Sequence, residues 1–182
     1  MSNPAPGALE RVRGFVNTWD AEDETDAIAS PDALRDWLAG QELLDAGAKV
    51  TRAEHERALA VREALRATLR AHHGHPDQEI GQEVLADASQ RAKLQVLFDD
   101  DGVSRLEPAA DGLDGALGRL LTIAHEADSE GRWTRLKICP ADDCQWAFYD
   151  QSRNRSATWC DMKVCGNRHK VREYRQRRLS PS

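Results

Sequence analysis

Residues 139–170 read CPADDCQWAFYDQSRNRSATWCDMKVCGNRHK, and they contain every cysteine of the chain: Cys139, Cys144, Cys160 and Cys165. Four residues separate the members of each pair, and fifteen residues separate the two pairs. Two close pairs joined by a hairpin-sized gap are typical of a chain that surrounds one tetrahedral ion with four thiolates. We therefore predict one structural Zn²⁺ ion, because four protein ligands leave no open position for a catalytic water.

Two alternatives to zinc binding exist for four cysteines in this pattern. The first is a pair of disulfides, which belongs to oxidising compartments. Residues 1–7 lack the basic and apolar regions of a secretory signal, and no stretch has the roughly 18 apolar residues that span a bilayer. We therefore expect a cytoplasmic protein without membrane contact, whose thiols stay reduced. The second alternative is an iron site, but four-residue gaps between the paired cysteines do not match the cysteine runs of ferredoxins.

The segments around the cysteines predict how the ligands are presented. In chain order we expect a strand at 135–138, a metal knuckle at 139–144, a strand at 146–149, a polar return at 151–157 and a helix that contains Cys165 or begins beside it. Knuckle, hairpin and ligand-bearing helix together make a treble-clef-like zinc finger over residues 135–178. We expect Trp146, Phe148 and Trp159 to form a small core beneath the metal, with base stacking as the alternative.

Charge is divided unevenly along the chain. From Gly131 onward there are twelve Lys and Arg against five Asp and Glu, whereas residues 1–130 hold thirteen basic and twenty-six acidic residues. This split favours an acidic body that carries a basic contact surface. The candidate contact residues are Arg153, Arg155, Arg168, Lys170, Arg172 and Arg175.

The helix after Gly166 carries most of these basic residues. At about 100° per residue, Arg168, Arg172 and Arg175 share one helix face, and Lys170 lies roughly opposite. Basic side chains neutralise phosphates and release counterions, so this surface fits nucleic acid. The alternative is a solvated helix whose cations interact with the helix dipole. A charge-dense helix fixed by a zinc module favours the nucleic-acid interpretation.

Residues 9–131 are predicted to form a mainly α-helical domain with one small β-hairpin, preceded by a disordered segment at 1–8. Apolar spacing and helix caps predict helices around 9–19, 31–40, 52–71 and 77–91, and a last helix from Leu113 to near Gly131. An apolar run at 94–98, an Asp-Gly turn and a second run at 103–107 predict the hairpin. The fold class is therefore α+β, with the zinc finger at the C-terminal end.

A few polar residues of this body raise the question of a second site. Asn17 and Thr18 interrupt an apolar helical segment and, with Arg62, are candidates for a ligand pocket; the alternative is hydrogen bonding at a helix end or in the core. The cluster His72, His73 and His75 has no carboxylate or cysteine partner at suitable spacing, which favours a solvated helix terminus over a metal site. No nucleophile, base and orienting group occur at recognisable spacing, so we expect no enzyme.

The C-terminal motifs resemble the CGNR zinc-finger family over residues 135–178. The residues that carry the resemblance are the four cysteines, Trp146 to Asp150, Ser152 to Ser156, Trp159 and Gly166-Asn167-Arg168-x-Lys170. The preceding part is similar to the ABATE domain in Phe15 to Thr18, Leu34 to Leu38 and Val61 to Arg66. This chain departs from the family at Ala157 and Thr158, where arginines are usual. The departure implies weaker phosphate contact or greater reliance on Arg153, Arg155 and the helix.

The resemblance implies a stress-induced transcription regulator that binds double-stranded DNA through its finger. The N-terminal domain would then sense a small-molecule effector or mediate assembly. One finger offers a small DNA footprint, which favours a homodimer. An adaptor whose finger binds RNA or an acidic protein partner is the alternative, because such folds serve many roles. An enzymatic N-terminal domain would need a deep pocket with perturbed titratable groups.

Overall fold

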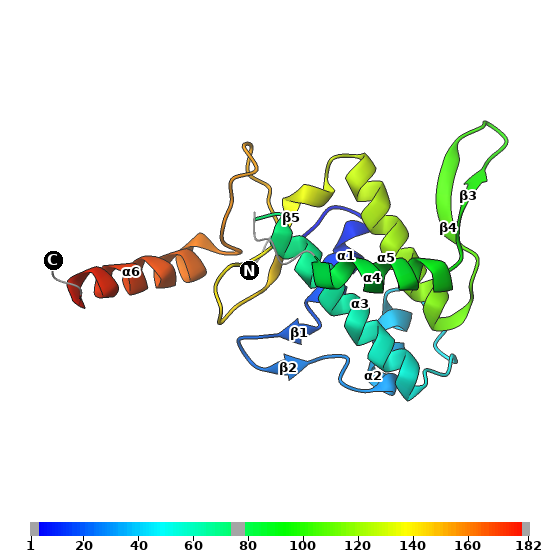
Figure 1. The fold of residues 1–182 in the computed structure, drawn as a ribbon, viewed down its shortest axis with the longest axis horizontal. Helices are drawn as coiled ribbons and strands as arrows, with labels where there is room; N and C mark the ends of the chain where they lie inside the picture. The colour runs from blue at the N-terminus through cyan, green and yellow to red at the C-terminus, as the bar shows by residue number, and fades with distance from the viewer. Residues whose placement is uncertain (1–3, 74–78, 180–182) are drawn as a thin grey trace.

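The computed structural model describes residues 4–73 and 79–179, which form a mainly helical molecule with three antiparallel strand pairs (Figure 1). The helices are α1 (Leu9–Val16), α2 (Pro31–Gly40), α3 (Arg52–Ala71), α4 (Glu79–Arg91), α5 (Gly112–Ser129) and α6 (Asn167–Leu179). The strand pairs are β1 (Trp19–Asp20) with β2 (Thr25–Asp26), β3 (Leu94–Phe98) with β4 (Ser104–Pro108), and β5 (Leu136–Ile138) with β6 (Ala147–Tyr149). The predicted fold class, an α-rich body with a hairpin followed by a four-cysteine finger, is confirmed.

Two helix starts have the caps that the sequence predicts. The Ser30 hydroxyl accepts a hydrogen bond from the Ala33 backbone N–H at 3.2 Å, with Pro31 in the first helical position of α2. Thr51 and Glu54 form a reciprocal capping box at the start of α3. Such caps satisfy backbone donors that have no partner within the helix. Within the described part of the chain, no helix combines the length and the apolarity that crossing a bilayer requires.

The N-terminal end differs from the prediction in two places. Helix α1 ends at Val16, whereas the prediction extended it to residue 19. The Asn17 side chain pairs with the backbone of β6, and Trp19 begins the short pair β1–β2. Ala5 is buried, and its backbone N–H donates to a Glu10 carboxylate oxygen at 2.7 Å. The predicted disorder of residues 1–8 therefore does not include residue 5, and residues 1–3 lie outside the described residues.

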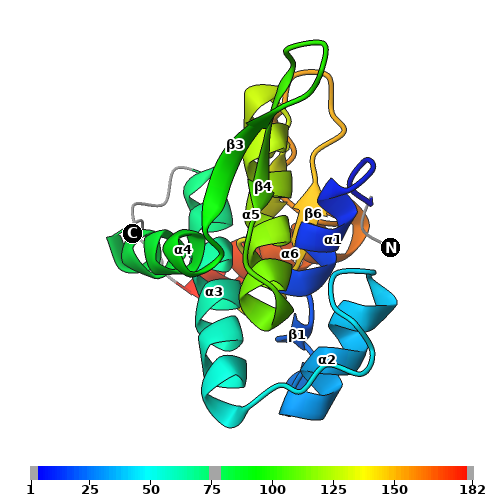
Figure 2. The same ribbon diagram turned by 90° about the vertical axis from the view of Figure 1, so that its right-hand side faces the viewer.

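The β3–β4 hairpin packs at its base and extends outward at its tip, as Figures 1 and 2 show. Its register pairs Leu94 with Pro108, and both lie against α5 at Gly118. A Cβ atom on Gly118 would lie 2.8 Å from the Pro108 Cβ atom, so this close approach requires glycine. The outer half of the hairpin continues beyond α5.

The β5–β6 hairpin of the finger lies against the helical body. Leu136, Ile138, Ala147 and Tyr149 belong to the same buried cluster as the apolar faces of α1, α3 and α5. The β5–β6 hairpin therefore joins the core of the body, whereas the residues around the cysteines form a second buried cluster. Helix α6 departs from the body and ends far from the β3–β4 hairpin (Figure 1).

Candidate metal centre and basic helix

The four cysteine side chains converge on one point. Their sulfur atoms all lie within 4.8 Å of one another; Cys160 Sγ is 3.5 Å from Cys144 Sγ and 3.7 Å from Cys165 Sγ. Zn–S bonds of about 2.3 Å at tetrahedral angles place sulfurs about 3.8 Å apart, so the set has the size of a zinc site. A disulfide needs about 2.05 Å. All four thiols are free, so the alternative of two disulfides is wrong.

Local backbone structure presents the first two ligands. The Cys139 N–H donates to the Trp146 carbonyl at 2.9 Å, which closes the β5–β6 ladder next to the knuckle. The Cys144 N–H donates to the Ala141 carbonyl at 2.9 Å, which forms the tight turn between the ligands. Gln145 then adopts the left-handed conformation, with φ at 51°, and redirects the chain into β6.

The last two ligands both precede α6, Cys160 just before a π-helical turn and Cys165 within it. Cys165 lies in a π-helical turn, Met162–Gly166, that leads directly into the helix. The Asp161 carboxylate caps this turn by accepting from the Lys163 and Val164 N–H groups. Metal binding at Cys165 therefore fixes the start of α6 relative to the knuckle.

The electrostatics of the thiols favour a divalent cation. Hydrogen bonds from Cys144 and Cys160 lower the pKa of the Cys139 thiol to about 2, whereas hydrogen bonding to Cys139 raises the pKa of Cys144 to about 12. Hydrogen bonding to the sulfur atoms of Cys139 and Cys144 raises the pKa of Cys160. The four cysteines therefore accommodate one thiolate, but ionisation of a second thiol is opposed, because it would place another negative charge beside the first. A cation at the centre removes this opposition, so the four residues form the site of one structural Zn²⁺ ion.

The predicted aromatic core beneath the metal is confirmed. Phe148 is buried against the cysteines, and Trp146 and Trp159 are partly buried in the same cluster. The Trp159 ring lies 4.8 Å from the His169 ring, which connects the cluster to α6. These rings are packed against protein, which argues against base stacking as their role.

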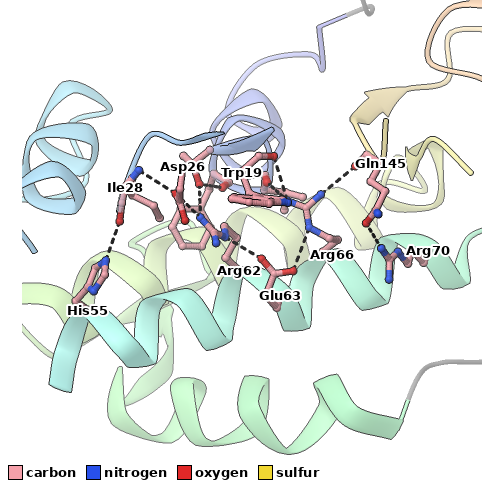
Figure 3. Close-up of polar contacts among 12 residues, drawn as sticks. Trp19, Asp26, Ile28, His55, Arg62, Glu63, Arg66, Arg70 and Gln145 are labelled. Atoms are coloured by element: carbon pink, nitrogen blue, oxygen red, sulfur yellow. Dashed lines mark hydrogen bonds and ion pairs between the residues drawn. The ribbon is translucent and has the colours of Figure 1, made fainter. Parts of the chain in front are cut away.

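Helix α3 holds the metal knuckle through two arginines (Figure 3). The Arg66 guanidinium donates to the Gln145 carbonyl at 2.9 Å and to the Val16 carbonyl at 2.5 Å, and its side chain is only 3 % exposed. Arg70 donates to the side-chain oxygen of Gln145. Gln145 directly follows a metal ligand, so α3 fixes the backbone at the knuckle.

The three candidate pocket residues are engaged with protein groups. Asn17 forms a pair of hydrogen bonds with the Ala147 backbone, donating at 2.9 Å and accepting at 2.7 Å. Arg62 is brought together with Thr18, to whose hydroxyl it donates at 3.2 Å, and with Asp26 at 2.8 Å (Figure 3). These contacts agree with the alternative of core hydrogen bonding, and a ligand role for the three residues stays a prediction.

A buried ion pair shapes the loop that carries Arg153 and Arg155. Lys137 Nζ donates to an Asp150 carboxylate oxygen at 2.7 Å and to the Arg155 carbonyl at 2.7 Å. Burial alone would raise the pKa of Asp150, but hydrogen bonds from Lys137 and Ser152 lower it to about 2. The pair leaves the Arg153 and Arg155 side chains exposed to solvent.

The predicted basic face of α6 exists, and two of its arginines are in ion pairs. Arg168, Arg172 and Arg175 line one open groove, whereas Lys170 does not contribute to it. Arg168 pairs with Glu22 of the β1–β2 turn at 2.6 Å, and this partner raises the pKa of Arg168. Arg172 donates to both carboxylate oxygens of Asp143, at 3.0 and 2.9 Å.

Comparison with protein families identifies both parts of the chain. Residues 11–128 match the ABATE family model, described as "Putative stress-induced transcription regulator". The chain belongs to the ABATE family. Residues 135–178, which hold all four ligands, match the CGNR zinc finger, as the sequence motifs predicted. No curated protein matches the chain.

Several residues that position the ABATE body and its zinc finger carry no sequence signal. Arg66, Lys137 and Glu22 belong to no motif in the sequence, and only the fold brings Arg66 and Glu22 to the finger and Lys137 to Asp150. His72 Nδ1 donates to the Leu136 carbonyl at 2.7 Å, and burial lowers the pKa of His72. His75 lies outside the described residues, and among those described the cysteines are the one group arranged to hold a metal.

Proposed function

We propose that this ABATE-family protein is a zinc-dependent transcription regulator that binds double-stranded DNA through α6 and the 151–157 loop. One observation supports this most strongly: a metal centre fixes the start of a helix whose exposed groove is lined by Arg168, Arg172 and Arg175. Arg153 and Arg155 are exposed on a loop stabilised by the Lys137–Asp150 pair. Such a surface provides several phosphate contacts.

The ion pairs on α6 are compatible with phosphate binding. Arg168 and Glu22 are 37 % and 50 % exposed, and Arg172 and Asp143 are similarly exposed. Exposed ion pairs contribute only about 0–1 kcal/mol, so phosphates can replace the carboxylates at small cost. Because Cys165 leads directly into α6, loss of zinc would release the helix from the knuckle and weaken DNA binding.

For the effector, a candidate site is a half-open pocket of about 270 Å³ between α3, α4 and α5, with an apolar floor and charged residues in its lining. Its walls include Val61, Val84 and Leu117, and Arg57 lies at its edge with a buried Nε that has no hydrogen-bond partner among the described residues. A small apolar molecule with a hydrogen-bond acceptor fits this lining. Thermal-shift screening tests this assignment, because a Val61→Trp variant that fills the cavity should abolish any ligand-induced shift.

The DNA-binding test is fluorescence anisotropy of a labelled mixed-sequence duplex with zinc-loaded protein across a salt series. Each phosphate contact contributes about −0.9 to the slope of log Kobs against log salt, so removing three contacts flattens it by about 2.7. We expect this change in an Arg168/Arg172/Arg175→Ala variant. An Arg35/Arg52/Arg91→Ala variant, which loses the same charge from the body, should keep the wild-type slope. Absence of binding at low salt would refute the proposal.

An adaptor that binds RNA or an acidic protein is the second candidate. A single-stranded RNA binder uses exposed aromatic rings. Trp146 and Trp159 are packed around the cysteines, whereas Tyr174 of α6 is exposed. The basic groove itself does not discriminate a duplex from an acidic protein, so that partner becomes the leading candidate if duplex DNA fails to bind. The proposal includes a reducing, cytoplasmic location, which would keep the thiols available for zinc, and no catalytic role.

A further inference from the structure

The exposed large apolar side chains of the described residues gather in two places. Those of the β3–β4 hairpin are Val96, Phe98 and Val103; those of the π-helical turn and α6 are Met162, Val164, Val171 and Tyr174. Exposed apolar patches of this kind mark interaction sites in soluble proteins. Figure 1 shows the hairpin and α6 at opposite ends of the molecule.

The hairpin is an apolar arm with an acidic tip. Side chains alternate between the two faces of a strand, so Leu94, Val96 and Phe98 share one face. Leu94 at the base packs against α5, whereas Phe98 is 70 % exposed. The turn that follows is Asp99-Asp100-Asp101, and Asp99 shapes it by accepting from the N–H groups of residues 101 and 103. The apolar face therefore continues past the body and ends in three carboxylates.

The groove on α6 is basic, whereas the tip of the hairpin is acidic. Like the hairpin, the groove combines charged and apolar residues. It has a volume of about 610 Å³, with Val164 and Val171 as its apolar lining. Its basic lining consists of Lys163, Arg168, Arg172 and Arg175, with Asp143 as the one acidic residue at its edge. Arg172 forms an ion pair with this Asp143. Among the described residues, Lys163 and Arg175 have no ion pair.

We propose that the hairpin arm of one copy docks in the α6 groove of a second copy. Like charges oppose contacts between two hairpins or between two α6 helices, whereas the acidic apolar arm and the basic apolar groove are complementary. The arm and the groove of one chain lie at opposite ends, so they cannot meet within a copy. Two copies in antiparallel orientation make both contacts at once and form a closed two-fold dimer.

This association has a consequence for DNA binding that rests on the proposed function. The docked arm covers Arg168, Arg172 and Arg175, which are also the proposed phosphate contacts. DNA and a second copy would therefore compete for α6. The dimer itself does not depend on that function, and it is measured in the absence of DNA.

The test uses sedimentation velocity of the zinc-loaded full chain with two charge-reversal variants. Asp100→Lys/Asp101→Lys reverses the arm and leaves Asp99 to shape the turn. Lys163→Glu/Arg175→Glu reverses the groove and leaves the ion pairs of Arg168 and Arg172 intact. Glu83→Lys/Glu126→Lys is the control, because it changes the net charge by as much as the arm variant at exposed helix positions.

We expect wild type and control to be dimers, each charge-reversal variant alone to be a monomer, and an equimolar mixture of the two variants to dimerise again. The mixture restores the dimer because a basic arm meets an acidic groove and an acidic arm meets a basic groove. Recovery on mixing would identify arm-to-groove contact, since contacts between like surfaces predict none. A monomeric wild type up to about 1 mM, dimers in either variant alone, or a mixture that stays monomeric would overturn the proposal.

Discussion

Arg66 is the residue whose loss should most clearly separate the zinc finger from the helical body. In an Arg66→Met variant the side chain keeps its length but loses the donors to the Gln145 and Val16 carbonyls, at 2.9 and 2.5 Å. A hydrogen bond from a charged group contributes about 1.5–3 kcal/mol. Burial of the guanidinium lowers the pKa of Arg66, which shows a desolvation cost that methionine avoids. We therefore take the lower value for each bond and expect a loss of about 3 kcal/mol.

Urea unfolding of the zinc-loaded protein measures this loss, which corresponds to roughly a 150-fold change in the folding equilibrium constant. Arg52→Met is the matched control, because Arg52 lies on the same helix with its side chain 90 % exposed. Surface changes of that kind stay within about 0.5 kcal/mol. Competition with a chromophoric chelator should also show faster zinc loss in Arg66→Met. A stability change below about 1 kcal/mol with unchanged zinc retention would show that Arg66 does not hold the knuckle.

Three further predictions concern the finger and its attachment. In Cys160→Ser the zinc content should fall from one ion per chain towards zero and duplex binding should be lost with it; full binding by the zinc-free variant would disprove the coupling. Asn17→Ala removes both hydrogen bonds to Ala147 and should cost about 2–3 kcal/mol in thermal unfolding, whereas an unchanged melting temperature would contradict this. The pKa of Asp150 is about 2 against an ordinary 3.8, so its stabilising effect is complete above about pH 4 and is lost as the pH falls through about 2. The difference in unfolding free energy between wild type and Asp150→Asn should shrink over that interval, and a constant difference would mean that the Lys137 contact is not electrostatic.

The parts of the fold that sequence could predict depend on local signals. The cap at Ser30, the capping box of Thr51 and Glu54, and the Asp-Gly turn each act within a few residues, and all three form as expected. The metal ligands could also be predicted from sequence, because the spacing of the four cysteines is typical of a tetrahedral site.

The attachment of the finger could not be predicted in the same way. Arg66 lies 79 residues from Gln145, and Glu22 lies 146 residues from Arg168. Each is one charged residue among many, and only the packing of α1, α3 and β6 brings it to its partner. For the same reason Asn17 was a candidate ligand residue, since a polar group in an apolar segment gives no sign of which backbone it will meet.

From the shared core of the β5–β6 hairpin and the helices, we predict that the abundance of this protein follows cellular zinc supply. Leu136, Ile138, Ala147 and Tyr149 are buried among residues of α1, α3 and α5, so a finger that loses its metal loosens the packing of the whole body. Chains with loosened cores are degraded faster in cells. Zinc scarcity would then reduce the number of copies of this protein. A fragment limited to residues 135–178 would expose these four side chains to water and should not be a faithful substitute for the full chain.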